Sequence, residues 1–228
     1  MKRSEINDLL DSARAFFAER GFALPPFAGW SPEELLDHRP EIGPIIAARL
    51  GWDLTDFGQG AFDETGQLLF TLRNGTVEDL RRGSGMCYAE KAMVSRREQI
   101  VPLHRHLTKG EDLINRGGGT LAVKLHGSDG QGHVDYRTEL VVVSDGLNRR
   151  LPPGGVLRLA PGESVSLPPG LWHAHWAEGA DVLVGEVSTV NDDITDNIFR
   201  DHVGRLGPIE EDEPPRLLLV SDYGRWFG

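Results

Sequence analysis

The feature that most constrains the fold is a series of short apolar runs that begins at about residue 52. Runs such as LLFTLRNG, VLRLAPG, SVSLPPG and VLVGEVSTV alternate with turn-forming glycine and proline, of which the chain has 28 and 14. These runs are shorter than typical helices and have the spacing of strands joined by tight turns. The sequence therefore predicts a mainly β protein, with antiparallel strands in a sandwich or barrel.

Residues 1–50 have a different pattern, which predicts helices. In SEINDLLDSARAFFAERGF, Ser4 is a suitable N-cap, apolar residues recur at helical spacing, and Gly21 supplies a stop. Ser31, followed by a proline and two glutamates, predicts a second helix, and residues 41–50 predict a short third one.

The length of 228 residues suits one domain with accessory segments. No linker separates the helices from the strands, so we expect the helices to pack against the β part. The predicted domain covers residues 1–228, with a helical segment over 1–50 and a β-barrel with a C-terminal extension over about 52–228.

The charge balance limits the kind of partner. Acidic residues outnumber basic residues by 35 to 24, and the formal charge of −11 disfavours general binding to nucleic acid or to an anionic membrane. Cys87 is the only cysteine, so we expect neither an intrachain disulfide nor a cysteine-based zinc cluster. The N-terminus lacks the apolar core of a signal peptide, and no apolar run approaches the ~20 residues that cross a bilayer. We therefore expect a cytoplasmic protein.

Candidate metal ligands occur first in residues 100–119, IVPLHRHLTKGEDLINRGGG. In a strand, side chains two residues apart share a face, so His104 and His106 point the same way. After a short turn, Glu111 can return beside them from the next strand. Two imidazoles and a carboxylate that converge in this way can hold a divalent metal. For this stretch alone, two histidines on a polar sheet face are the simpler alternative.

A second stretch, APGESVSLPPGLWHAHWAEG at residues 160–179, favours the metal interpretation. Gly162 permits a tight turn into a strand, and a Pro-Pro-Gly turn then precedes His173. This places His173 at the start of a strand, where it can face inwards. His175 would share that face and would either line the cavity or replace His173 as a ligand.

Together the two stretches resemble the paired motifs of the cupin superfamily, H-x-H-x4-E followed by G-x5-P-x-G-x2-H. Two positions depart from that pattern: Glu98 stands where glycine is usual, and Ala177 stands where asparagine is usual. Both positions shape turns rather than bind metal. The resemblance implies a cupin jelly-roll barrel with a metal inside it and about two coordination positions left for substrate oxygens. The implied metal ligands are His104, His106, Glu111 and His173.

Further segments between about residues 85 and 225 resemble the D-lyxose isomerase family. They are HRHLTKGEDLINRGGGTLAVKL, LPPGLWHAHWAEG, GEVSTVNDDITDN and GPIEEDEPPRLLL. That family consists of cupin aldose–ketose isomerases that act on lyxose and often on mannose. The resemblance implies interconversion of D-lyxose with D-xylulose, and of D-mannose with D-fructose, through a cis-enediol. It also implies Mn2+ as the cofactor, with Co2+ as another candidate, a small sugar as the substrate and, by analogy with other cupins, a homodimer.

The residues that transfer the proton are predicted from their positions. Lys109 lies between two ligands in the sequence, and we expect it to bind a substrate oxygen or to assist proton transfer. The carboxylate candidates for the base, in order of preference, are Glu211 in the acidic run EEDE, Asp193 in a loop beside Asp192, and Glu186 in the apolar strand VLVGEVSTV. A carboxylate in an apolar strand is costly unless it is paired or functional.

Two other functions remain open at this point. A cupin dioxygenase that contains iron or nickel could use the same ligands, since one fold hosts many chemistries. A non-enzymatic sugar-binding cupin would bind its ligand without interconverting it. The polar residues around Lys109 and Asp193 favour a hydroxylated substrate over an apolar one.

Overall fold

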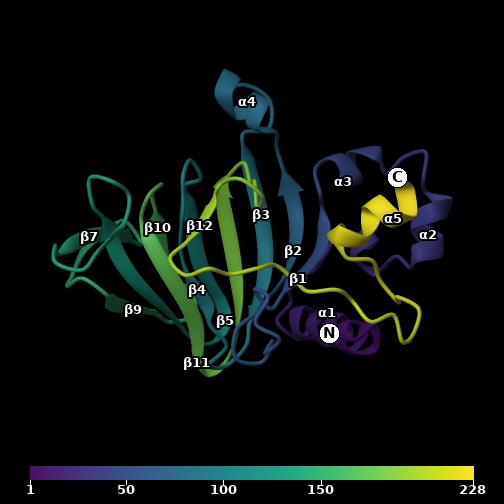
Figure 1. Ribbon diagram of the computed structural model, residues 1–228, viewed down its shortest axis with the longest axis horizontal. Helices are drawn as coiled ribbons and strands as arrows, with labels where there is room; N and C mark the ends of the chain where they lie inside the picture. The colour runs from purple at the N-terminus through teal and green to yellow at the C-terminus, as the bar shows by residue number, and fades with distance from the viewer.

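The computed structural model describes residues 1–228 and shows a mainly β protein with most of its helices near the two ends of the chain (Figure 1). The helices are α1 (Arg3–Glu19), α2 (Pro32–Asp37), α3 (Gly43–Ala47), α4 (Val77–Arg82) and α5 (Tyr223–Phe227), with 3-10 turns at Pro26–Gly29 and Val220–Asp222. The strands are β1 (Gly51–Thr55), β2 (Gln67–Asn74), β3 (Tyr88–Ser95), β4 (Val101–His106), β5 (Glu111–Ser128), β6 (Val134–Asp135), β7 (Leu140–Ser144), β8 (Leu147–Leu151), β9 (Gly155–Leu159), β10 (Ser164–Leu167), β11 (Trp172–Thr189) and β12 (Asn197–Phe199). The predicted class, mainly β with N-terminal helices, is confirmed.

The sheet is built around β5 and β11, which are both 18 residues long and run antiparallel to each other. The first half of β11 pairs with β4 on its other side, whereas the second half pairs with β3. Likewise, β5 pairs first with β10 and then with β9. The main path of pairing runs β1-β2-β3-β11-β5-β10-β7-β8, and no hydrogen bonds join β8 back to β1. The predicted jelly roll is therefore a curved antiparallel sheet that does not close.

Glycine permits the bend that both long strands make near their middle. The pairing of β5 with β11 shifts register between Glu178 and Val182, opposite the Gly117–Gly119 run. Gly118 has a φ of +112°, and a Cβ on it would lie 2.0 Å from the carbonyl oxygen of Asp181. No side chain fits there, so the close approach of the two strands requires glycine.

One apolar core fills the concave side of the curved sheet, and a second lies between the sheet and α1. The concave core combines residues from both halves of β5 and β11, including Leu113, Val123 and Val184. On the opposite face, Phe17 of α1 stacks on Trp52 of β1 with ring centroids 6.1 Å apart. The helical segment is thereby packed directly against the strands.

The start of α1 differs from the prediction. The helix begins at Arg3 with Lys2 in the N-cap position, so Ser4 lies within its first turn. The backbone N–H and the hydroxyl of Ser4 both donate to the carboxylate of Asp212, at 3.0 and 2.7 Å. The C-terminal segment therefore supplies the cap that the sequence pattern assigned to Ser4.

The other helical predictions are confirmed. Gly21 has a φ of +67° just after α1, and Ser31 forms a capping box with Glu34 at the start of α2. Helix α3 lies within the predicted residues 41–50. Helix α4 was not predicted. None of the helices is both long and apolar enough to cross a membrane.

A buried arginine joins the two ends of the chain. The Arg3 side chain is 1% exposed and donates to both carboxylate oxygens of Asp222 at 2.9 and 3.0 Å. It also donates to both oxygens of Glu211, each at 2.9 Å. Burial opposes the charge of Arg3, but the hydrogen bonds to the two carboxylates outweigh it and raise the pKa of the guanidinium.

We expect Asp222→Asn to lower the free energy of unfolding by about 3 kcal/mol, since it leaves the buried Arg3 without its buried counterion. Glu211→Gln is the matched control, because Glu211 is 35% exposed and such pairs contribute only about 0–1 kcal/mol. Urea unfolding of the three proteins measures both changes. If both variants lose the same free energy of unfolding, the prediction that the buried ion pair contributes more than the exposed one is wrong.

Candidate metal centre

Three strands bring the four predicted metal ligands together. His104 and His106 lie on one face of β4, Glu111 opens β5, and His173 is the second residue of β11, directly opposite His104. All four residues are buried, and one ligand atom from each lies within 4.8 Å of the others. The convergence expected from the two sequence motifs is therefore present in the structure.

Backbone carbonyls orient two of the imidazoles. Nδ1 of His104 lies 2.8 Å from the carbonyl oxygen of Pro102, and Nδ1 of His173 lies 3.1 Å from that of Leu171. Because these carbonyls can only accept, they fix the proton on Nδ1 and leave each Nε2 with its lone pair free for a metal. His106 has no hydrogen bond at either ring nitrogen, although the Asp196 carboxylate lies 3.7 Å from its Nδ1.

The donor set fits a divalent cation. Oε1 of Glu111 lies 2.9 Å from Nε2 of His173 and 3.3 Å from Nε2 of His106. Burial and the neighbouring His173 and His106 hold the pKa of His104 well below its usual value, which keeps that imidazole neutral. Neutral imidazoles together with one carboxylate are suitable ligands for a range of divalent transition metals. The buried, unpaired nitrogens of His106 point to the same use.

Lys109 lies directly beside this group. Its Nζ is 2.6 Å from Oε2 of Glu111 and 2.9 Å from Oε1 of Glu186, and its side chain is only 3% exposed. Burial opposes ionisation of Glu111, but Lys109, His106 and His173 together outweigh it and keep the pKa of Glu111 well below its usual value. The ammonium of Lys109 therefore forms ion pairs with two carboxylates, one of which belongs to a candidate metal ligand.

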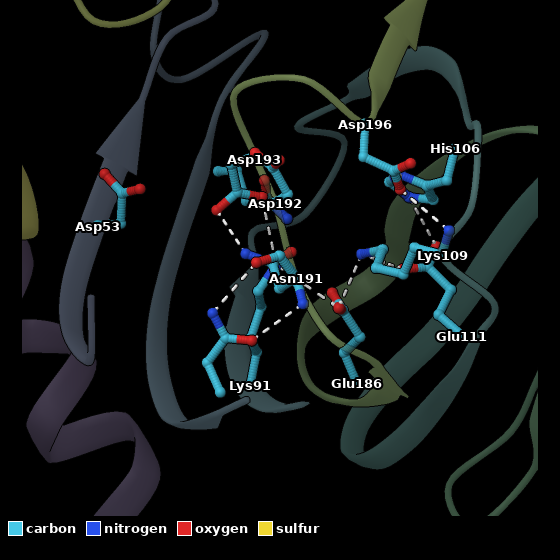
Figure 2. A network of polar contacts seen from close by, with 12 residues as sticks. Asp53, Lys91, His106, Lys109, Glu111, Glu186, Asn191, Asp192, Asp193 and Asp196 are labelled. Atoms are coloured by element: carbon cyan, nitrogen blue, oxygen red, sulfur yellow. Dashed lines mark hydrogen bonds and ion pairs between the residues drawn. The ribbon is translucent and has the colours of Figure 1, made fainter. Parts of the chain in front are cut away.

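The polar contacts continue from Glu186 to a second buried lysine (Figure 2). Nζ of Lys91 lies 3.5 Å from Oε1 of Glu186, 3.4 Å from Oδ1 of Asp193 and 2.5 Å from Oδ1 of Asn191. Burial opposes the charge on Glu186, but Lys109 and then Lys91 lower its pKa below the usual value. Glu186 is therefore ionised and lies between two ammonium groups.

The structure separates the predicted catalytic residues into two groups. Lys109, Glu186 and Asp193 belong to one network beside the metal ligands. Glu211 instead pairs with Arg3 and Arg225, and none of its ion pairs or hydrogen bonds involves a residue of that network.

Asp192 has a local role, since its carboxylate accepts hydrogen bonds from the backbone of Ile194 and Thr195. His175 is buried with an unpaired Nδ1, and burial lowers its pKa to about 4. It is not one of the four clustered residues.

Three polar residues at the site were missed in the sequence. Lys91 interrupts the apolar strand YAEKAMVS, and this signal is of the same kind as the one that singled out Glu186. Asn191 and Asp196 lie in the loop between β11 and β12, where nothing in the local pattern distinguishes them from ordinary turn residues. Asp196 accepts from the backbone N–H of Thr108 and of Lys109, at 2.7 and 3.0 Å, and so holds the turn between the ligands.

The turn before β4 keeps its shape without the glycine that the motif usually has. Glu98 has a φ of +62°, in the left-handed region that glycine occupies most readily. Its N–H donates to the carbonyl oxygen of Ala177 at 2.8 Å, so the two positions that depart from the cupin pattern contact each other.

Fold and site together define a protein with a curved antiparallel sheet and a buried site of three histidines and one glutamate. The D-lyxose isomerase family model matches residues 1–223. A D-lyxose/D-mannose isomerase of Escherichia coli O157:H7 is 46% identical over 227 residues, which cover 98% of each chain. One of Serratia proteamaculans is 45% identical over 231 residues and covers both chains fully. The chain belongs to the D-lyxose isomerase family.

Solved structures agree on the fold. An L-ribose isomerase of Cellulomonas parahominis, solved with L-ribose, superposes with a TM-score of 0.61 at 15% identity and covers 92% of this chain and 98% of its own. The L-ribose isomerase of Geodermatophilus obscurus gives a TM-score of 0.54 at 17% identity, over 87% of this chain and 92% of its own. At such low identity, the likeness concerns the fold alone.

We expect a divalent metal to stabilise the protein through this cluster. Protein stripped with a chelator should gain ~2.7 kcal/mol of unfolding free energy when Mn2+ is added at 100 times its dissociation constant. The measurement is the melting temperature as a function of Mn2+ concentration. His104→Ala and His173→Ala should lose the shift, and His133→Ala, whose side chain is 73% exposed, should keep it. A shift that survives in His104→Ala and His173→Ala would place the metal elsewhere.

Proposed function

We propose that this chain is a metal-dependent aldose–ketose isomerase that interconverts D-lyxose with D-xylulose and D-mannose with D-fructose. Family membership and the names of the two curated relatives support the activity and the substrates. The observation that carries the proposal is the buried ammonium of Lys109, which contacts both the candidate metal ligand Glu111 and the carboxylate of Glu186.

Isomerisation moves a proton between C1 and C2 of the open-chain sugar and develops negative charge on the oxygens. A divalent metal held by His104, His106, Glu111 and His173 would polarise these oxygens when bound. Lys109 has three N–H donors, of which two meet Glu111 and Glu186, so one is left for a substrate oxygen. A buried ammonium in this position stabilises an oxygen on which charge develops.

Glu186 is the carboxylate best placed to take the proton from carbon and return it. It is ionised and buried, and the ammonium of Lys109 lies between its carboxylate and that of Glu111. Asp193 is the second choice, because it reaches the same network only through Lys91. Glu211, preferred from sequence alone, comes last because its carboxylate is held by two arginines.

We also propose Mn2+ as the native metal, with Co2+ able to replace it, and a homodimer as the state of assembly. Both proposals rest on the resemblance to the family. The cytoplasmic location and the single domain over residues 1–228 stay predictions. The packing of Phe17 against Trp52 supports the single domain.

An aldose–ketose assay on metal-stripped protein tests the proposal. After resupply of Mn2+ or Co2+, we expect interconversion of both sugar pairs, and His104→Ala should lose it because a ligand is missing. A lack of turnover with either metal, despite stoichiometric metal binding, would contradict the proposal. It would favour the dioxygenase or the sugar-binding alternative, which oxygen uptake and calorimetry distinguish.

We expect Glu186→Gln to lower kcat by about 10²–10⁴-fold, as loss of a general base does. Its metal content should match that of the wild type, because Glu186 is not among the clustered ligands. The measurement is kcat together with metal stoichiometry. Glu211→Gln should keep kcat near the wild-type value, and a selective loss of turnover in that variant instead would restore Glu211 as the base.

A further inference from the structure

A cavity of about 300 Å³ adjoins the network beside the metal ligands. Strands β1 and β2 form one wall, and the segment 193–205, which includes β12, forms the other. Its polar lining residues include Asp53, Gln67, Asn197 and Arg205, and its aromatic lining residues are Phe57 and Phe199.

Three contacts connect this cavity to the site. The ring of Phe199 stacks on that of His104, with centroids 5.3 Å apart and an interplanar angle of 29°. Asn197 pairs with His106 in the ladder between β12 and β4. Asp193, which also lines the cavity, is the residue that pairs with Lys91. Residues that line the cavity therefore contact two of the candidate metal ligands, His104 and His106, and the lysine network beside them.

An ion pair joins the two walls. Nη2 of Arg205 lies 3.2 Å from Oδ2 of Asp53, and its Nη1 donates to the carbonyl oxygen of Asp193 at 3.5 Å. The N–H of Gly204 donates to the carbonyl oxygen of Phe57 at 2.9 Å, which fixes the segment to the end of β1. Figure 2 shows Asp53 on the opposite side of the network from Lys109, facing the loop that carries Asp193.

The lining suits a chain of hydroxylated carbons. The carboxylate of Asp53 accepts hydrogen bonds, the guanidinium of Arg205 donates them, and the amides of Gln67 and Asn197 do both, as sugar hydroxyls require. Phe57 and Phe199, whose rings meet edge to face with centroids 5.6 Å apart, add apolar lining for the C–H groups of such a chain. The volume is at the lower end of the range for small-molecule sites, which matches a small ligand.

We propose that this cavity receives the part of the sugar farthest from C1, and that Asp53 and Arg205 bind its terminal hydroxyl groups. The inference rests on the proposed isomerase function and adds to it a site that selects for chain length. D-Lyxose and D-mannose have the same configuration at C2, C3 and C4, and mannose has one additional CH2OH group. Discrimination between the two sugars therefore depends on the groups that meet the far end of the chain.

The test compares Asp53→Asn and Arg205→Met with the wild type, all loaded with Mn2+, on both sugars. We expect kcat/KM for D-mannose to fall about 10-fold, mostly through KM, since about 1.4 kcal/mol of hydrogen bonding is lost. D-Lyxose should change much less. Arg158→Met is the matched control, because it breaks a surface ion pair between Arg158 of β9 and Glu178 of β11 and should leave kcat/KM for both sugars unchanged.

An unchanged ratio of kcat/KM for the two sugars would overturn the proposal, whether both values fall together or neither falls. Metal content is measured in parallel, because the proposal requires it to stay at the wild-type level in both variants. A loss of metal would show that Asp53 and Arg205 support the fold of the site rather than bind sugar.

A binding measurement separates this proposal from the isomerase proposal. D-Mannitol, which cannot be isomerised, is titrated into the Mn2+-loaded proteins by calorimetry. Binding to the wild type that weakens about 10-fold in Arg205→Met supports the cavity as a polyol site even if no sugar is interconverted. Absence of binding to the wild type, or equal binding to the wild type and Arg205→Met, would overturn it.

Discussion

The bent pairing of β5 with β11 is the constraint on which the rest of the structure depends. Glu111 pairs with Ser188 at one end of this ladder, and His173 pairs with Leu125 at the other. In straight strands, the 14 residues between these ends would span ~48 Å. The ligand atoms of Glu111 and His173 instead lie 2.9 Å apart, because β5 turns back at Gly117–Gly119 and β11 turns back opposite, between Glu178 and Val182. The bend therefore brings the candidate metal ligands together.

A second constraint is the charge inside the curved sheet. Glu111, Glu186 and Asp193 are carboxylates in one network, and Lys91 and Lys109 are the cations between them. Each lysine contacts two carboxylates, so no charge in this interior stands alone, as the cost of burying an ion demands. The carboxylates outnumber the lysines. A divalent cation held by the three imidazoles and Glu111 would add positive charge where the excess is negative.

The candidate metal ligands could be named from the sequence because strand periodicity and turn chemistry were read together with the resemblance to the paired cupin motifs. The two-residue alternation placed His104 and His106 on one face, and the turn chemistry located His173. The position of Glu211 could not be deduced, because it depends on where the C-terminal segment meets Arg3, more than two hundred residues earlier. The same long-range contact explains why Asp212, rather than Ser4, caps α1. Lys91 could have been identified by the same reasoning as Glu186, because each is a charged residue in an otherwise apolar strand.

The close contact at Gly118 has a consequence for genetics. Gly118 is not part of the site, and its only notable neighbour is the backbone of Asp181 and Val182 on the opposite strand. Any other residue there would push apart the strands that carry Glu111 and His173. An allele with a side chain at this position would resemble the loss of a metal ligand, although every residue of the centre is intact. A position at which a substitution inactivates the protein is therefore not necessarily a metal ligand or a catalytic residue.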